Sequence, residues 1–219
     1  MPSIIVKNLS FSLTLKSSNL STFLPNFYLF KKKKFHSIIN NLSFDVKQNE
    51  KLAIVGSNGS GKTTLLKLLA GIYKPSSGSI FTNGLINNAI ELGYGVYPYS
   101  SGKRNIELQG LIYGLRGKPL SIFIDKVIEF ASIGNLISEP WITYSQGMKS
   151  RIKAGITITK PADIILMDEW LNAGDKDFKE KLKNEFDIYS KNKIIIFTSH
   201  DEALASKLST RFIKIKKQT

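Results

Sequence analysis

The chain has 219 residues, 42% hydrophobic and 22% charged, which is typical of a globular protein large enough to bury a core. It contains no cysteine, which excludes disulfide bonds, thiolate metal sites and a cysteine nucleophile. Its formal net charge of +14 favours a polyanionic partner, either nucleic acid or an anionic membrane surface, unless the lysines are only a solvated surface. The length predicts a single domain over residues 1–219.

The N-terminus, MPSIIVKNLS, has no basic region followed by a long apolar stretch, so no signal peptide is expected. No apolar run approaches the ~18 residues that a membrane-spanning helix needs. We therefore expect a chain that does not cross a membrane by itself.

Strands dominate the prediction for the first third of the chain. An opening strand is expected at 3–7, and LSFDVK (42–47) has the period-2 alternation of a half-buried strand. KLAIV (51–55) is a short apolar strand that ends directly at a glycine. Residues 17–37 show no strand period, so they are interpreted as an insertion with one short helix, broken at Pro25.

Two helices are predicted in the middle of the chain. The first carries apolar positions from Ile106 to Leu115 and stops near Gly117. The second begins behind Ser121 as its N-cap and stops at Gly134.

The last third alternates strands and helices. It comprises a buried strand at 163–167, a helix with Phe178, Leu182, Phe186 and Tyr189 on one face, a buried strand at 193–197 and an edge strand at 211–215. Such alternation predicts an α/β fold with a mainly parallel sheet covered on both faces.

The stretch GSNGSGKTT (56–64) matches the phosphate-loop pattern G-x-x-x-x-G-K-[ST], between a strand and an apolar helical stretch. Glycines let successive backbone N–H groups face phosphates, and the helix N-terminus adds its positive dipole end. Lys62 is expected to reach the β- and γ-phosphates and the Thr63 hydroxyl to bind Mg²⁺. The predicted ATP-binding residues are Gly56, Ser57, Asn58, Gly59, Ser60, Gly61, Lys62, Thr63 and Thr64.

Three polar residues follow buried strands near the C-terminus. Asp168 ends an apolar strand, where the magnesium partner of a phosphate loop belongs, and Glu169 could orient or deprotonate the attacking water. The alternative is an acidic pair that complements a helix dipole. His200 leaves the strand at 193–197 and is expected at the same sheet edge, facing the γ-phosphate.

Residues 143–151, TYSQGMKSR, form a Ser-x-Gly turn that leads into a basic helix start. The order of phosphate loop, this turn, Asp-Glu and a strand-tip His resembles the ATP-binding-cassette (ABC) ATPases, whose LSGGQ signature corresponds to YSQGM (144–148). The resemblance implies that four residues contact ATP held by the other subunit: Ser145, Gln146, Gly147 and Met148. It also implies a D-loop at 172–175, with Asp175 crossing the dimer interface.

The same resemblance implies an architecture. It is a P-loop NTPase fold with a mainly parallel core, an antiparallel β subdomain, and a helical signature subdomain at roughly 100–150. RFIKI ends close to the C-terminus of the chain, so no C-terminal carbohydrate-binding domain is expected.

SGSI (77–80), residues 91–117 and DEWLNAGD (168–175) are similar to the polysaccharide-exporting branch of this family. That similarity implies an ATP- and Mg²⁺-dependent homodimer that drives export of a capsule, O-antigen or teichoic-acid polymer. It implies separate transmembrane permease subunits, the cytoplasmic face of the inner membrane, and no nucleic-acid partner. The alternatives are an ABC ATPase for a drug, lipid or peptide, or a soluble ABC ATPase that acts on nucleic acid or ribosomes.

Some residues depart from the family pattern. Gln146 replaces a small residue, and Glu91 stands where a glutamine is usual, as a candidate metal ligand. The adenine-stacking aromatic is left open between Phe11, Tyr28 and Phe35.

The stretch FLPNFYLFKKKKF (23–35) combines five aromatics with four lysines. It is interpreted either as a membrane-facing segment, as a nucleic-acid contact or as a solvated loop.

Overall fold

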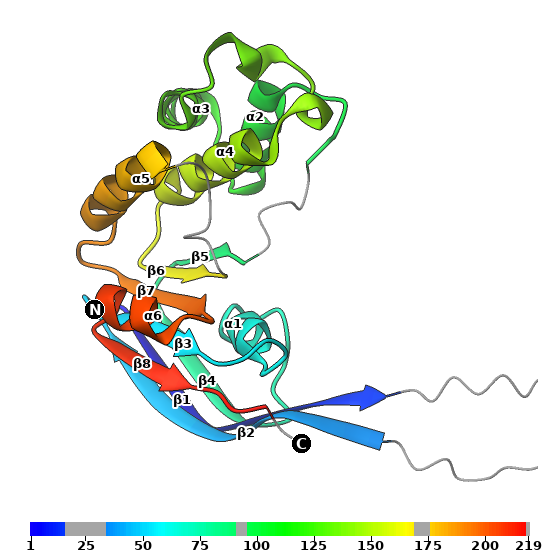
Figure 1. Ribbon diagram of the computed structural model, residues 1–219, viewed down its shortest axis with the longest axis vertical. Coiled ribbons are helices and arrows are strands. Elements are labelled where there is room, and N and C mark those ends of the chain that lie inside the picture. The colour runs from blue at the N-terminus through cyan, green and yellow to red at the C-terminus, as the bar shows by residue number, and fades with distance from the viewer. Residues whose placement is uncertain (16–33, 91–95, 169–175, 218–219) are drawn as a thin grey trace, which may run out of the picture.

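The computed structural model describes residues 1–15, 34–90, 96–168 and 176–217 (Figure 1). The strands are β1 (Ser3–Leu15), β2 (Lys34–Lys47), β3 (Lys51–Val55), β4 (Ser77–Asn83), β5 (Ile86–Ala89), β6 (Ile164–Met167), β7 (Ile194–Ser199) and β8 (Arg211–Lys214). The α-helices are α1 (Lys62–Leu69), α2 (Gly102–Ile112), α3 (Gly117–Ala131), α4 (Gln146–Thr159), α5 (Lys176–Tyr189) and α6 (Glu202–Leu208). Two short 3-10 helices, η1 (Gly134–Ser138) and η2 (Trp141–Thr143), precede α4.

The strands form two sheets. The five-stranded sheet has the order β5-β6-β7-β3-β8, and all of its neighbouring strands run parallel. The three-stranded sheet has the order β2-β1-β4 and is antiparallel. This confirms the predicted α/β class with a parallel core, an added antiparallel sheet and a C-terminal edge strand.

The apolar strand β3 is buried on both faces because its side chains alternate between two cores. Leu52 and Ile54 pack with α1 and with the antiparallel sheet, so α1 lies between the two sheets. Ala53 and Val55 face a second core that includes Phe186 of α5, on the opposite face of the parallel sheet. The phosphate loop therefore follows an interior strand, between β7 and β8, of a sheet that is covered on both sides.

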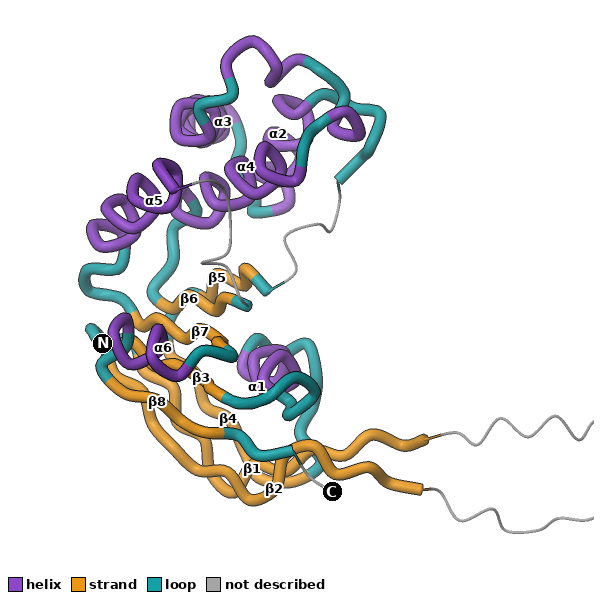
Figure 2. The backbone as a smooth tube through the Cα atoms, viewed as in Figure 1, coloured by secondary structure: helices purple, strands orange, loops and turns teal. Residues whose placement is uncertain are grey.

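A separate layer of helices, α2, α3 and α4, lies beyond the β5 edge of the parallel sheet (Figures 1 and 2). It has its own core, which includes Ile106, Val127 and Ile152. Phe178 and Leu182 of α5 join this layer through contacts with Phe130 of α3. These contacts confirm the predicted apolar face of α5.

The antiparallel sheet differs from the sequence prediction in length and number of strands. β1 continues to Leu15 rather than ending at residue 7, and β2 already begins at Lys34, inside the stretch interpreted as an insertion. Each strand is stabilised by the other through pairs as far as Leu15 with Lys34, which no local pattern reveals. β4 and β5 were not predicted, and the short helix proposed around Pro25 lies outside the described residues.

The boundaries of the middle helices also differ. α2 ends at Ile112, and α3 begins at Gly117, so Ser121 lies inside the helix and is not its N-cap. Pro119 is compatible with the first turn of α3 because backbone N–H groups there have no partner within the helix. Ser132, in the left-handed conformation, ends α3 where Gly134 was expected. α4 continues to Thr159.

Among the described residues, none of the helices combines the length and the apolar character needed to cross a membrane.

Candidate nucleotide-binding and hydrolysis site

The phosphate loop connects β3 to α1 and contains glycines at positions where a side chain would meet close neighbours. Gly61, the N-cap of α1, has φ 101°, and a Cβ there would lie 2.6 Å from Cγ2 of Ile38. A Cβ on Gly56 would lie 2.5 Å from the carbonyl oxygen of Ile215 and 2.6 Å from the Ser60 hydroxyl. A side chain at either position would displace these neighbours, and at Gly61 it would also strain the backbone.

Lys62 folds back over the loop that precedes it. Its Nζ donates to the carbonyl oxygens of Gly56, at 2.9 Å, and Ser57, at 3.2 Å, and the residue is only 7% exposed. The hydroxyl of Ser60 is also buried and has no hydrogen-bond partner among the described residues. A buried cation and an unpaired hydroxyl beside a helix N-terminus suit an oxyanion such as phosphate.

Asp168 follows β6 and faces the start of α1. Its Oδ2 accepts a hydrogen bond of 2.7 Å from the Thr63 hydroxyl, across 105 residues of sequence. Its Oδ1 accepts from the Thr198 hydroxyl at the end of β7. The structure thus brings together Thr63 and Asp168 as predicted, and it adds Thr198, which the sequence analysis did not single out.

An open cleft of about 620 Å³ lies over the loop. Its lining residues are His36, Ile38, Asn58, Gly59, Gly61, Lys62, Thr63, Thr64, Ile90 and Asp168. His36 and Ile38 come from β2, so the antiparallel sheet supplies one wall of the cleft.

Three aromatic residues, Phe11, Tyr28 and Phe35, were candidates to stack on the adenine ring. Phe11 is 8% exposed and stacks on Tyr73 with ring centroids 5.5 Å apart, so its ring is already covered. Tyr28 lies outside the described residues, and the side chain of Phe35 is not described. Among the described residues that line the cleft, His36 is the one with an aromatic ring. It was not predicted as a site residue, because residues 17–37 show no strand periodicity.

The signature stretch begins α4. Ser145 is the N-cap, and its hydroxyl accepts from the Met148 N–H at 3.2 Å. Gln146 is exposed, and a Cβ on Gly147 would meet only the Ser145 hydroxyl, at 3.7 Å. None of these four residues lines the cleft over the phosphate loop.

Tyr144, just before the signature, holds this turn against the start of α2. Its hydroxyl donates to the carbonyl oxygen of Leu136, at 2.7 Å, and accepts from the Gly102 N–H, at 3.2 Å. A Cβ on Gly102 would lie 2.3 Å from that hydroxyl, which explains the glycine. Burial raises the pKa of the Tyr144 hydroxyl, which keeps it protonated as a donor.

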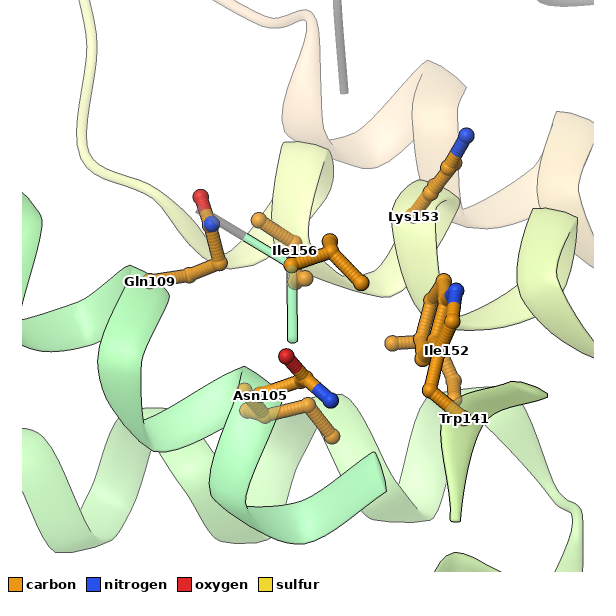
Figure 3. Close-up of a pocket in the computed structure, with 8 residues that line it drawn as sticks. Asn105, Gln109, Trp141, Ile152, Lys153 and Ile156 are labelled. Atoms are coloured by element: carbon orange, nitrogen blue, oxygen red, sulfur yellow. The ribbon is translucent and has the colours of Figure 1, made fainter. Parts of the chain in front are cut away.

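Asn105 fixes the loop that enters the helical layer. Its amide donates to the carbonyl oxygens of Tyr97, Ser100 and Ser101, and its oxygen accepts from the Tyr97 N–H. Below it lies a cavity of only about 10 Å³ between α2, η2 and α4, with Gln109 and Lys153 on opposite sides (Figure 3). That cavity is too small for a ligand, so it belongs to the packing of the helical layer.

Of the remaining predicted site residues, the structure describes His200. His200 directly follows β7 and is exposed, at the expected edge of the parallel sheet. Glu91, Glu169 and Asp175 lie outside the described residues.

A parallel sheet with an interior strand that leads into a phosphate loop, and an aspartate at the end of the strand two places away, defines a P-loop NTPase. The chain belongs to the ABC transporter family, because the sequence pattern of that family matches residues 39–172, more than half of the sequence. It is therefore an ATP-binding ATPase of this family.

Similar proteins agree with this membership. The O-antigen export system ATP-binding protein of Klebsiella pneumoniae is 35% identical over 191 residues, covering 87% of this chain and 77% of the relative. The teichoic acids export ATP-binding protein of Bacillus cereus is 39% identical over 189 residues, covering 84% of this chain but only 34% of the relative. A dimeric ATP-binding cassette bound to ADP and phosphate has the same fold, with a TM-score of 0.77 at 17% identity over 99% of this chain and 97% of that one.

Proposed function

We propose that this chain is the ATP-hydrolysing subunit of a bacterial exporter that moves a lipid-linked cell-surface polysaccharide across the inner membrane. The observation that carries the cargo class is the similarity to export proteins for O-antigen and teichoic acids, at 35% and 39% identity over most of this chain. In this proposal the chain works at the cytoplasmic face of the membrane as a homodimer beneath separate permease subunits.

In this proposal, Lys62, Glu169 and His200 have distinct tasks in hydrolysis. Lys62 would leave the Gly56 and Ser57 carbonyl oxygens and bind the β- and γ-phosphates, while loop N–H groups hold the phosphate oxygens. Glu169, the residue after Asp168 in the sequence, would take a proton from the attacking water. His200, beyond the end of β7, would contact the γ-phosphate from the adjacent strand. Catalysis then depends on positioning and on charge stabilisation.

The residues around Thr63 also fit Mg²⁺. The Thr63 hydroxyl donates its proton to Asp168, so its oxygen lone pairs are free for a hard cation that prefers oxygen ligands. Asp168 would hold the ion through a water molecule, with Glu91 as a further candidate ligand. An ion held by these residues would supply positive charge that offsets the negative charge of the phosphates.

Gly147 supports a site that is shared between two chains. Within this chain, a Cβ at position 147 would meet only the Ser145 hydroxyl, at 3.7 Å, and would fit without a clash. The described part of the chain therefore gives no internal reason for this glycine. A close approach by ATP on a second protomer supplies one, with Ser145 and Gln146 beside it and Asp175 crossing the interface.

Mixing two inactive variants tests the shared site. In a heterodimer of Lys62→Ala and Gly147→Asp, one composite site carries both lesions and the other carries none. A one-to-one mixture should therefore recover about a quarter of wild-type ATPase activity if the two sites act independently. The measurement is phosphate release after subunit exchange, with each variant alone as the control. Heterodimers that form without any recovery would contradict a site shared between chains.

The cargo is tested in cells that depend on this chain. With Lys62→Ala as the only copy, surface polysaccharide should disappear, because export of the polymer would depend on ATP hydrolysis by this chain. The measurement is immunoblotting of surface and internal polymer, together with purification of the tagged chain from membranes. Unchanged polymer would contradict the cargo class, and a ribosome or nucleic acid recovered in place of a polytopic membrane protein would contradict export altogether.

A further inference from the structure

Thr198 carries a buried hydroxyl near the end of β7, directly after four apolar residues. Every residue from Ile194 to Phe197 is buried and apolar, and Thr198 is 3% exposed. A valine would have nearly the same shape and an equal preference for a strand. Burying a hydroxyl there is unfavourable unless it is hydrogen-bonded, and its bond to Asp168 satisfies it.

The strand order places Thr198 between the two halves of the site. β7 lies between β6, which leads to Asp168, and β3, which leads to the phosphate loop. Thr198 pairs with Ile54 of β3, and Phe197 pairs with Met167 of β6. One residue further along both β6 and β7, Asp168 and Thr198 therefore lie opposite each other. The parallel register therefore brings this hydroxyl to the Asp168 carboxylate without any loop rearrangement.

The Asp168 carboxylate is held from both sides. Thr63 donates to Oδ2 and Thr198 donates to Oδ1, so each oxygen has its own donor. Two donors on opposite oxygens oppose rotation of the carboxylate about its Cβ–Cγ bond, and they keep Oδ2 beside Thr63. Without the Thr198 bond, the carboxylate could turn away from the loop.

We infer that Thr198 is a positioning residue for Asp168, which sets the affinity of the site for the divalent cation that accompanies ATP. The inference rests on the proposed Mg²⁺–ATP site. Outer partners of ligating groups typically change metal affinity by about 10- to 100-fold. Thr198 should therefore act on metal binding and leave metal-free nucleotide binding unchanged.

The test is Thr198→Val, which removes the hydroxyl and keeps the shape. With a saturating non-hydrolysable ATP analogue, the apparent dissociation constant for Mn²⁺, measured by electron paramagnetic resonance, should rise about tenfold. Binding of the analogue in EDTA should stay at the wild-type level. Thr198→Ser, which keeps the hydroxyl, should restore the Mn²⁺ affinity.

Ser199→Ala is the matched control. Ser199 is also buried, one residue further on, but its hydroxyl bonds the backbone of Asp201 and not Asp168. It should leave Mn²⁺ affinity unchanged. Wild-type Mn²⁺ affinity in Thr198→Val would overturn the inference, and so would an equal loss of analogue binding with and without metal. Failure of the wild-type chain to bind the analogue at all would instead contradict the proposed function.

Discussion

Lys62→Ala should abolish ATP binding and, with it, hydrolysis. Lys62 is the side-chain cation of the phosphate loop, and its Nζ already lies against the Gly56 and Ser57 carbonyl oxygens at the floor of the cleft. Without it, the negative charge of the β- and γ-phosphates has no buried counter-charge in the loop. The shortened side chain also releases two hydrogen bonds that keep the loop curled.

The measurement is thermal unfolding with and without an ATP analogue. At a concentration about 100 times its Kd, the analogue should stabilise the wild-type chain by about 2.7 kcal/mol, which raises Tm by roughly 5–10 °C. Lys62→Ala should show no rise. Lys67→Ala is the control, because this lysine lies on the same helix but faces the ring of Tyr73, 5.7 Å away. An analogue-induced rise in Lys62→Ala equal to that of the wild type would contradict the assigned role.

Glu169→Gln should leave ATP binding intact and lower hydrolysis by about 10²–10⁴-fold, as expected when a general base is lost. Glu169 is assigned as the general base because it directly follows Asp168 in the sequence. Asp168 lines the cleft and accepts a hydrogen bond from Thr63. Glutamine keeps the size and polarity of glutamate but cannot accept the proton of the attacking water.

Single-turnover hydrolysis by dimers loaded with ATP is the measurement, because it separates chemistry from product release. Glu180→Gln is the control, since Glu180 is an exposed glutamate of α5. It should hydrolyse ATP at the wild-type rate. If Glu169→Gln does the same, Glu169 is not the base, and the water must be activated by another group of the site.

The predictions that the structure confirmed come from contiguous stretches. The loop at 56–64 could be recognised because its chemistry needs adjacent glycines, one lysine and one threonine, and β3 because apolar residues in an unbroken run suit a strand buried on both faces. The apolar face of α5 was visible for the same reason, since helical periodicity is a local signal. Helix ends were less certain, because Ser121 can cap a helix or lie within one.

Tertiary structure alone decided how distant segments meet. β1 and β2 are extended to Leu15 and Lys34 by pairing with each other, and that pairing carries His36 and Ile38 to the cleft. Thr63 and Asp168 are 105 residues apart, and Thr198 is 30 residues from Asp168. The sequence by itself predicted a phosphate loop at residues 56–64, because the residues of that loop are neighbours in the chain. The order β6-β7-β3 decided which side chains complete the site, because parallel neighbours in a sheet end at the same edge whatever their separation in sequence.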